Sequence, residues 1–302
     1  MSGRPFVYIA GLIRTGSTAL SEALSEPGRA LIIREPRLGT NRIVLRDADL
    51  ASLARLGTEA DRVLAWPRRV MGGLRTIGKG GHMSGGAGEG HLSGYAARVF
   101  RDRIVAPLSR KLEQVGIKEV RHDGWEHVLA AFPDLACVAI GRDPRDVYLS
   151  HRVRVGKKGN DLPTPAAFAG ELSRQFALQR ALIEATGALA IRYEDLCQDS
   201  EVLPGVRAHV QSPVTGSGSV GQFTSAQSLR QSEAELHGDA LTDRRVARWT
   251  READPEALTA ATEVFERLGA YTEYWGYDPD GLAPTFSTTR LASAPTSGSA
   301  AA

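Results

Sequence analysis

Two patterns of apolar and polar residues alternate along the chain: short strand-like segments and longer segments with apolar residues at helical spacing. Continuous apolar runs of the buried-strand kind lie at residues 6–10, 30–33 and 135–140, and further strands are expected at residues 117–120 and 188–192. Apolar positions at helical spacing lie at residues 17–24, 96–114, 124–131, 143–151, 166–186 and 255–268. Strands that alternate with helices build parallel sheets with helices on both faces. The pattern therefore predicts an α/β fold, a three-layer domain around a parallel sheet.

Segments of biased composition interrupt this pattern, and we expect a single domain over residues 1–280 that contains two of them. Residues 71–94 hold ten glycines, which disfavour a packed element. A long loop of this kind is either a disordered insertion or a lid over a binding site, and both interpretations stay open. Residues 212–231, rich in Ser, Gly, Thr and Gln, predict a polar surface loop, and residues 281–302 predict a disordered tail.

Composition limits the classes of partner and compartment. The chain has 302 residues and a formal net charge of +2, from 37 basic and 35 acidic side chains. A nearly neutral chain is not built to wrap nucleic acid. Two cysteines, Cys137 and Cys197, are too few for a disulfide framework. The sequence shows neither a signal-peptide pattern nor an apolar stretch of the roughly 20 residues that span a bilayer, so we expect a cytoplasmic protein.

A glycine-bounded loop joins the first predicted strand to the first predicted helix. Such a loop, here Gly11 to Gly16, directs backbone N–H groups and a helix N-terminus at a phosphate. ATP-binding P-loops place Lys and then Ser or Thr after the second glycine, but Ser17 and Thr18 stand there. The only cation of the loop is Arg14. We predict a P-loop-like, mononucleotide-binding topology without Mg²⁺-dependent ATPase chemistry and with no metal.

A second candidate phosphate site follows the apolar run 135–140. Arg142 stands at the end of this predicted strand, and Ser150 lies two turns into the next helix, which Asp143 and Pro144 begin. A cation and a hydroxyl in these positions can hold one phosphate together. Because adjacent strand ends of a doubly wound sheet face the same crevice, this site and the glycine loop can share one ligand.

Three segments together resemble the family of sulfotransferases that use PAPS (3′-phosphoadenosine 5′-phosphosulfate), especially its bacterial and carbohydrate branches. The glycine-bounded loop with residues 14–18 resembles the family's 5′-phosphosulfate loop. Arg142 and Ser150 together resemble its 3′-phosphate motif. Residues 191–196, Ile-Arg-Tyr-Glu-Asp-Leu, resemble a third block. The resemblance implies PAPS as the donor, helical and loop insertions on the acceptor side, and a small-molecule, carbohydrate or lipid acceptor. The loop residues that it assigns to the donor are Arg14, Thr15, Gly16, Ser17 and Thr18.

The sequence departs from the family in two places. Many members carry Lys in the first loop, so the resemblance gives Arg14 the role of stabilising the leaving phosphate. No segment of this sequence clearly matches the family's C-terminal, glycine-rich nucleotide loop. Arg244, Arg245, Arg248 and Trp249 lie roughly where it would end, and an exposed helix face explains them equally well.

Transfer to a hydroxyl needs a base, for which there are two candidates. Glu35 follows the second predicted strand, which we expect beside the glycine loop of the first strand in a βαβ unit, in a region where the carbohydrate and bacterial branches use a glutamate. His122 follows the third predicted strand, about where the cytosolic small-molecule branch uses a histidine, but that branch's Lys-Thr/Ser-His pattern is absent. We expect Glu35 to be the base, with His122 as the alternative.

Two other functions fit parts of the pattern. A P-loop kinase or NTPase would share the glycine loop, but Ser17 stands where its Lys should be. A non-catalytic nucleotide-binding protein would keep the fold and lose the chemistry, although the presence of both Arg14 and Glu35 argues against it. The basic stretch at residues 151–158 is typical of a solvated face, and alternatively it would recruit an anionic acceptor.

Overall fold

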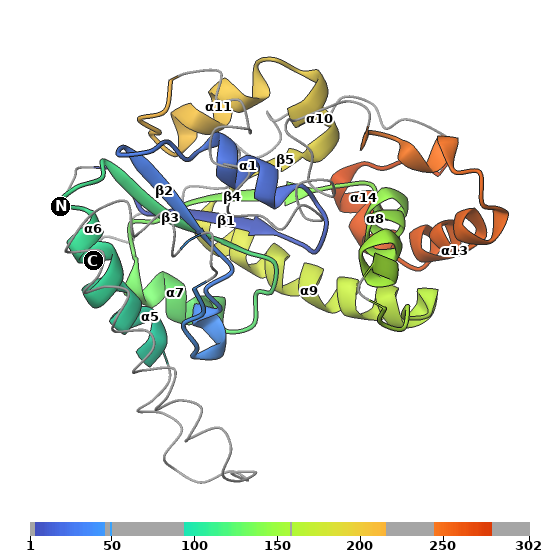
Figure 1. Ribbon diagram of the computed structural model, residues 1–302, viewed down its shortest axis with the longest axis horizontal. Coiled ribbons are helices and arrows are strands. Elements are labelled where there is room, and N and C mark those ends of the chain that lie inside the picture. The colour runs from blue at the N-terminus through green and yellow to red at the C-terminus, as the bar shows by residue number, and fades with distance from the viewer. Residues whose placement is uncertain (1–3, 46–48, 50–93, 158, 216–244, 280–302) are drawn as a thin grey trace, which may run out of the picture.

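The structure, a computed structural model, describes residues 4–45, 49, 94–157, 159–215 and 245–279 (Figure 1). The predicted glycine-rich loop, polar loop and tail lie outside the described residues, apart from Gly94 and residues 212–215. All the predicted donor-binding and catalytic residues lie within them.

A five-stranded sheet forms the centre of the protein, and all its strands are parallel (Figure 1). The strands are β1 (Val7–Gly11), β2 (Ala30–Arg34), β3 (Gln114–Glu119), β4 (Ala136–Gly141) and β5 (Leu189–Arg192). Their order is β2-β3-β1-β4-β5, which puts β1 in the middle. The predicted α/β fold around a parallel sheet is confirmed.

Helices cover both faces of this sheet. The longer helices are α1 (Ser17–Ala23), α5 (Tyr95–Phe100), α7 (Trp125–Ala131), α8 (Pro144–Lys157), α9 (Pro165–Thr186), α10 (Tyr193–Gln198), α11 (Val202–His209), α13 (Pro255–Glu266) and α14 (Gly269–Trp275). The short helical segments are η1 (Leu38–Thr40), η2 (Arg101–Val105), α6 (Ala106–Leu108) and η5 (Arg248–Arg251). Figure 1 shows α1, α10 and α11 over one face of the sheet and α7 and α9 over the other.

Alternation along the strands divides the core into two halves. Successive strand side chains point to opposite faces. Tyr8 and Ala10 therefore join one buried apolar cluster, while Val7 and Ile9 join the other. The first cluster includes residues of α5, α9, α13 and α14, and the second includes residues of α1, α10 and α11. Because both faces are buried, β1, β2 and β4 are largely apolar in sequence, whereas β3 also buries Gln114, Lys118 and Glu119.

Two expectations about local structure are wrong. The helix expected over 96–114 ends at Leu108, and β3 already begins at Gln114. Pro107 has no amide hydrogen for the helical ladder, and the turns before it are π-helical. Beyond them the amide of Gln114 donates to the Arg29 carbonyl, which begins the pairing with β2. The expectation that β2 lies directly beside the loop of β1 is also wrong, because β3 lies between them.

The carboxyl ends of four strands meet at one edge of the sheet. Gly11 pairs with Ile140, so the loop after β1 and the turn after β4 are neighbours. Arg34 pairs with Lys118, so Glu35 lies beside the end of β3. Open α/β sheets bind their ligands at this edge.

Candidate functional site

The loop after β1 is held in shape by its own side chains. The buried Thr15 hydroxyl donates to the Leu12 carbonyl over 2.9 Å and accepts from the Leu12 amide over 3.1 Å. Gly16 has a φ of 88°, and a Cβ atom there would lie 2.2 Å from Cδ2 of Tyr193. A side chain at this position would meet both a strained backbone and a ring. The third sequence block, which contains Tyr193, therefore helps to shape the first.

Arg14 stands in this loop with a φ of 65°. Its Nε donates to Oγ of Ser150 over 2.9 Å, so the structure brings the loop cation to the predicted helix hydroxyl. Burial, and then the cations of Arg154, Arg142 and Arg245, lower the pKa of Arg14 to about 10. A cation that is desolvated and repelled in this way is stabilised by a bound anion.

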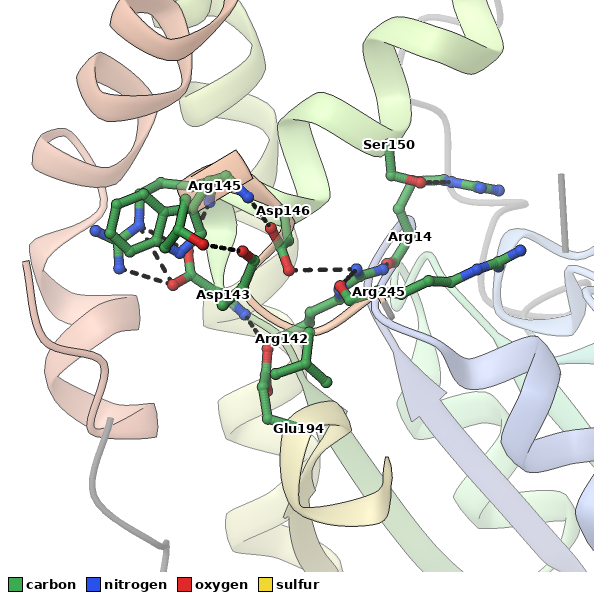
Figure 2. A network of polar contacts seen from close by, with 12 residues as sticks. Arg14, Arg142, Asp143, Arg145, Asp146, Ser150, Glu194 and Arg245 are labelled. Atoms are coloured by element: carbon green, nitrogen blue, oxygen red, sulfur yellow. Dashed lines mark hydrogen bonds and ion pairs between the residues drawn. The ribbon is translucent and has the colours of Figure 1, made fainter. Parts of the chain in front are cut away.

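Arg142 lies at the turn after β4, with 5% of its surface exposed. Its guanidinium donates to the Asp146 carboxylate over 3.4 Å, to the Arg14 carbonyl over 3.3 Å and to the Arg245 carbonyl over 2.6 Å (Figure 2). The side chain thus connects the glycine loop, α8 and the segment before η5. Segments more than 100 residues apart in the sequence are joined through this one side chain.

The backbone and ring contacts of Arg142 fix its position further. The Tyr271 hydroxyl accepts from the Arg142 amide over 2.9 Å and donates to the Arg142 carbonyl over 2.8 Å. The guanidinium lies 4.5 Å from the centroid of the Tyr193 ring. Nε of Arg142 is buried, and no described residue accepts its hydrogen bond. Buried donors normally have a hydrogen-bond partner, and the described residues supply none for this one.

The arginines around the loop outnumber the carboxylates that could neutralise them. Among the described residues, no carboxylate forms an ion pair with Arg14, Arg154 or Arg245. The fully buried Asp146 pairs with Arg142. Figure 2 shows the side chains of Arg14 and Arg245 extending in the same direction, away from Asp146. The result is a local surplus of positive charge in a chain that is nearly neutral, which is typical of an anion-binding site.

Glu35, the expected base, follows β2 with a φ of 53°. Its Oε1 accepts from Nζ of Lys118 over 2.6 Å. The Lys118 side chain is 1% exposed and that of Glu35 is 18% exposed. The charge of Glu35 partly offsets the lowering of the Arg14 pKa, which places it near the loop. Glu35 therefore reaches the site from beyond β3.

His122, the alternative base, is 1% exposed. Its Nε2 lies 2.8 Å from the Gly11 carbonyl and its Nδ1 lies 3.4 Å from the Tyr8 hydroxyl. Burial lowers the pKa of His122 to about 4, so the ring is neutral and Nε2 carries the proton that Gly11 accepts. Both ring nitrogens face buried protein groups.

The comparisons with known proteins bear on the fold. No protein-family model and no curated protein matches this sequence. The sulfotransferase domain from the curacin biosynthetic pathway is 16% identical, covers 92% of this chain and 99% of its own, and superposes with a TM-score of 0.59. The sulfotransferase domain from the Synechococcus PCC 7002 olefin synthase is 15% identical, covers 88% and 94%, and has a TM-score of 0.50. The chain has the fold of a sulfotransferase domain.

Within this sulfotransferase fold, the structure brings most of the predicted site residues to one edge of the sheet. The loop residues 14–18, Arg142, Ser150 and Glu35 gather there, whereas His122 lies beneath the loop. Ser150 also accepts a hydrogen bond from Arg14, so its hydroxyl links the two predicted phosphate sites.

Several supporting residues were not identified from the sequence. Asp146 lies four residues from Arg142, a spacing that could have indicated it; Arg154, four residues from Ser150, was expected only as part of the basic stretch at residues 151–158. Glu119 is buried at the end of β3, where burial raises its pKa to about 8. Tyr271 is far away in the sequence and carries no signal of its contact with Arg142.

A second arginine of the same motif has a structural role. Arg145 forms an ion pair with Asp143 at 2.7 Å and donates to the carbonyls of Asp278 and Pro279. Its guanidinium lies 3.7 Å from the Trp249 ring centroid and 4.1 Å from that of Phe265. These contacts leave Arg145 3% exposed and tie the motif to the last described segment.

No group of three or more His, Cys, Asp or Glu side chains among the described residues could hold a metal ion. None of the described helices combines the length and apolar character needed to cross a bilayer.

Proposed function

We propose that this protein transfers a sulfuryl group from PAPS to a hydroxyl or amine of an acceptor. The observation that carries the proposal is the contact between Arg14 and Ser150 inside an arginine cluster that lacks matching carboxylates among the described residues. The sulfotransferase fold is compatible with this function, and the three sequence blocks favour it.

The anionic parts of the donor fit two parts of the site. Arg14, with the amides of residues 15–18, would hold the 5′-phosphosulfate. Arg142, whose buried Nε has no described partner, would hold the 3′-phosphate together with Ser150. The Ser150 hydroxyl accepts from Arg14 and can still donate its own proton to a phosphate oxygen. Guanidinium groups suit this role because they stay charged and bind phosphate oxygens in pairs.

In the proposed transfer, one bond to sulfur forms and another breaks. The acceptor oxygen attacks sulfur in line, and the bond from sulfur to the bridging oxygen of the donor breaks. The product PAP (3′,5′-bisphosphoadenosine) leaves with that electron pair. Glu35 takes the proton of the acceptor hydroxyl, and Arg14 stabilises the charge that develops on the leaving phosphate.

Glu35 suits the role of base better than His122. The Lys118 ammonium at 2.6 Å favours the ionised carboxylate, which is the form that accepts a proton. Part of the Glu35 side chain is exposed at the edge of the sheet. His122 is buried, and its Nε2 is already engaged with the Gly11 carbonyl.

Calorimetric titration with PAP and with ATP, each with and without Mg²⁺, tests the choice of donor. We expect tight PAP binding that does not need Mg²⁺, and weak ATP binding. Tight ATP binding that depends on Mg²⁺ would support a P-loop kinase instead. PAP binding without transfer from PAPS to any compound of a broad acceptor screen would support a non-catalytic nucleotide-binding protein.

The variant Glu35→Gln tests the base. We expect it to keep the PAP affinity within about twofold and to lower turnover by a factor of about 10²–10⁴, the usual contribution of a general base. The control is Glu26→Gln, which removes a carboxylate before the start of β2, where Glu26 pairs with Arg29. Normal turnover in Glu35→Gln would end the assignment of Glu35 as the base.

A further inference from the structure

One face of α8 carries charged and polar side chains at intervals of one turn. Asp146, Ser150 and Arg154 are four residues apart, a spacing that stacks side chains along one side of a helix. Asp146 contacts Arg142 and Ser150 contacts Arg14, so this face is turned toward the glycine loop. Arg154 continues the row by one further turn, about 6 Å along the helix axis and away from Arg142.

Arg154 is half-buried beside the site, and no described residue pairs with it. No carboxylate in the described ranges lies within ion-pair distance of its guanidinium, and no hydrogen bond to a described residue satisfies it. After burial, Arg154 is the largest cause of the lowered Arg14 pKa, ahead of Arg142 and Arg245. Arg154 is therefore a close neighbour of Arg14 and adds to a repulsion that an anion would relieve.

His151, the neighbour of Ser150, belongs to the same region. Its ring lies 5.0 Å from the Phe168 ring centroid, and its buried Nδ1 has no hydrogen-bond partner among the described residues. Burial, and then the cations of Arg14 and Arg154, lower the pKa of His151. A neutral imidazole with an unused nitrogen can donate to, or accept from, a polar ligand group.

The donor has groups to contact elsewhere in the site, which leaves Arg154 without a role in holding it. The proposed donor contacts use Arg14, Arg142, Ser150 and the loop amides, and the Arg245 side chain extends beside Arg14 (Figure 2). Arg154 lies one turn beyond Ser150, at the end of the row that is farthest from Asp146 and its partner Arg142. A cation beside the donor site that no described carboxylate neutralises is suited to an anion on the acceptor.

We propose that Arg154, together with His151, forms an anion subsite for the acceptor, so that the acceptor carries a carboxylate or phosphate close to the hydroxyl that receives the sulfuryl group. This inference rests on the proposed function, because it takes the Arg14 region as the donor site. It turns the basic stretch after the second motif from a solvated face into a determinant of acceptor specificity.

Matched pairs of hydroxy compounds test this subsite in PAP-saturated protein. Lactate against lactamide, mandelate against mandelamide, and glycerol phosphate against glycerol each differ in an anionic group. We expect the anionic member of at least one pair to bind at least tenfold more tightly, by calorimetry or by competition. In Arg154→Met this preference is lost, and in Arg154→Lys part of it is kept.

The control variant is Arg152→Met, which removes the same charge from the same helix. Arg152 pairs with Asp254 at 2.8 Å, so it is already neutralised, and we expect the anion preference to survive. The affinity for PAP should stay within about threefold in both Met variants.

Three results would overturn the inference. The first is equal binding of charged and neutral members by the wild-type protein, and the second is an anion preference that persists in Arg154→Met. The third is a loss of PAP affinity in Arg154→Met as large as that in Arg14→Ala, which would place Arg154 in the donor site. If the wild-type protein does not bind PAP, the proposed function fails; if it binds PAP without any anion preference, only the subsite fails.

Discussion

Two groups of arginines meet at the turn after β4, where Arg142 belongs to one group and Arg145 to the other. The groups differ in how their charge is neutralised. Arg145 is enclosed by the Asp143 carboxylate, two carbonyls and two aromatic rings. Arg14 and Arg154 lie near one another and near Arg142 without a carboxylate partner among the described residues. The described residues neutralise the charge of the first region, but they do not neutralise that of the second.

The difference separates stability from binding. A buried cation whose hydrogen-bonding groups and charge are matched locally holds segments together, and its loss leaves an unpaired partner behind. A cluster of unmatched cations costs free energy in the empty protein and regains it when an anion binds. Arginine side chains near the same turn can therefore have different roles: one stabilises the fold, and another binds an anion. The contacts of each side chain, rather than the residue type, decide its role.

The largest effect that would test this comparison is expected for Arg145→Met. Removing the guanidinium leaves Asp143 buried without its ion-pair partner, which typically costs about 3–5 kcal/mol of unfolding free energy. Urea denaturation measures this loss. The control is Arg180→Met, an exposed arginine paired with Glu184, for which less than about 1 kcal/mol is expected. Equal stability of the two variants would contradict a structural role for Arg145.

A second test is Arg14→Ala, for which we expect a loss of PAP affinity with little change in the unfolding free energy. Hydrogen bonds to charged groups contribute about 1.5–3 kcal/mol, so PAP affinity should fall by a factor of about 10–150. The unfolding free energy should change little, because the removed cation has no carboxylate partner among the described residues and is repelled by its neighbours. Calorimetry with PAP and urea denaturation give the two quantities. A large loss of stability with unchanged PAP affinity would reverse the comparison.

The third effect, which is the smallest when taken per pH unit, concerns the carboxyl of Glu119, behind the candidate base. Burial, partly offset by the Arg37 amide and reinforced by Glu35, raises the pKa of Glu119 from 4.5 to about 8. The folded state therefore binds this proton more tightly than the unfolded chain does. The resulting stability is present below about pH 4.5 and is lost as pH rises through about 8, with a slope of at most about 1.4 kcal/mol per pH unit.

The variant Glu119→Gln should flatten this part of the stability profile, because an amide keeps the oxygen that accepts from the Arg37 amide and does not ionise. Denaturation midpoints between pH 5 and pH 8 measure the slope. Glu184→Gln on exposed α9 is the control and should leave the slope unchanged. A slope in Glu119→Gln equal to that of the wild type would show that Glu119 does not titrate in this range.

Much of the fold was predictable because its signals are local. Apolar runs indicated β1, β2 and β4, and the glycine loop indicated the turn from β1 into α1. The expected helix at 96–114 failed where Pro107 and the pairing of Gln114 with β2 override helical periodicity. The place of β3 between β1 and β2 was not predictable, since strand order depends on contacts between segments about 80–100 residues apart.

The candidate site shows the same division at the level of single residues. The sequence alone determined which residue types follow the strands, and because parallel strands share one carboxyl edge, it indicated that Arg14, Arg142, Ser150 and Glu35 would gather there. Only the tertiary structure decided that Arg14 takes Ser150, that His122 lies under Gly11, and that Arg145 is neutralised while Arg154 is not. The charge balance around a side chain depends on neighbours from distant segments. The order of residues in the sequence does not show which of these segments will come together.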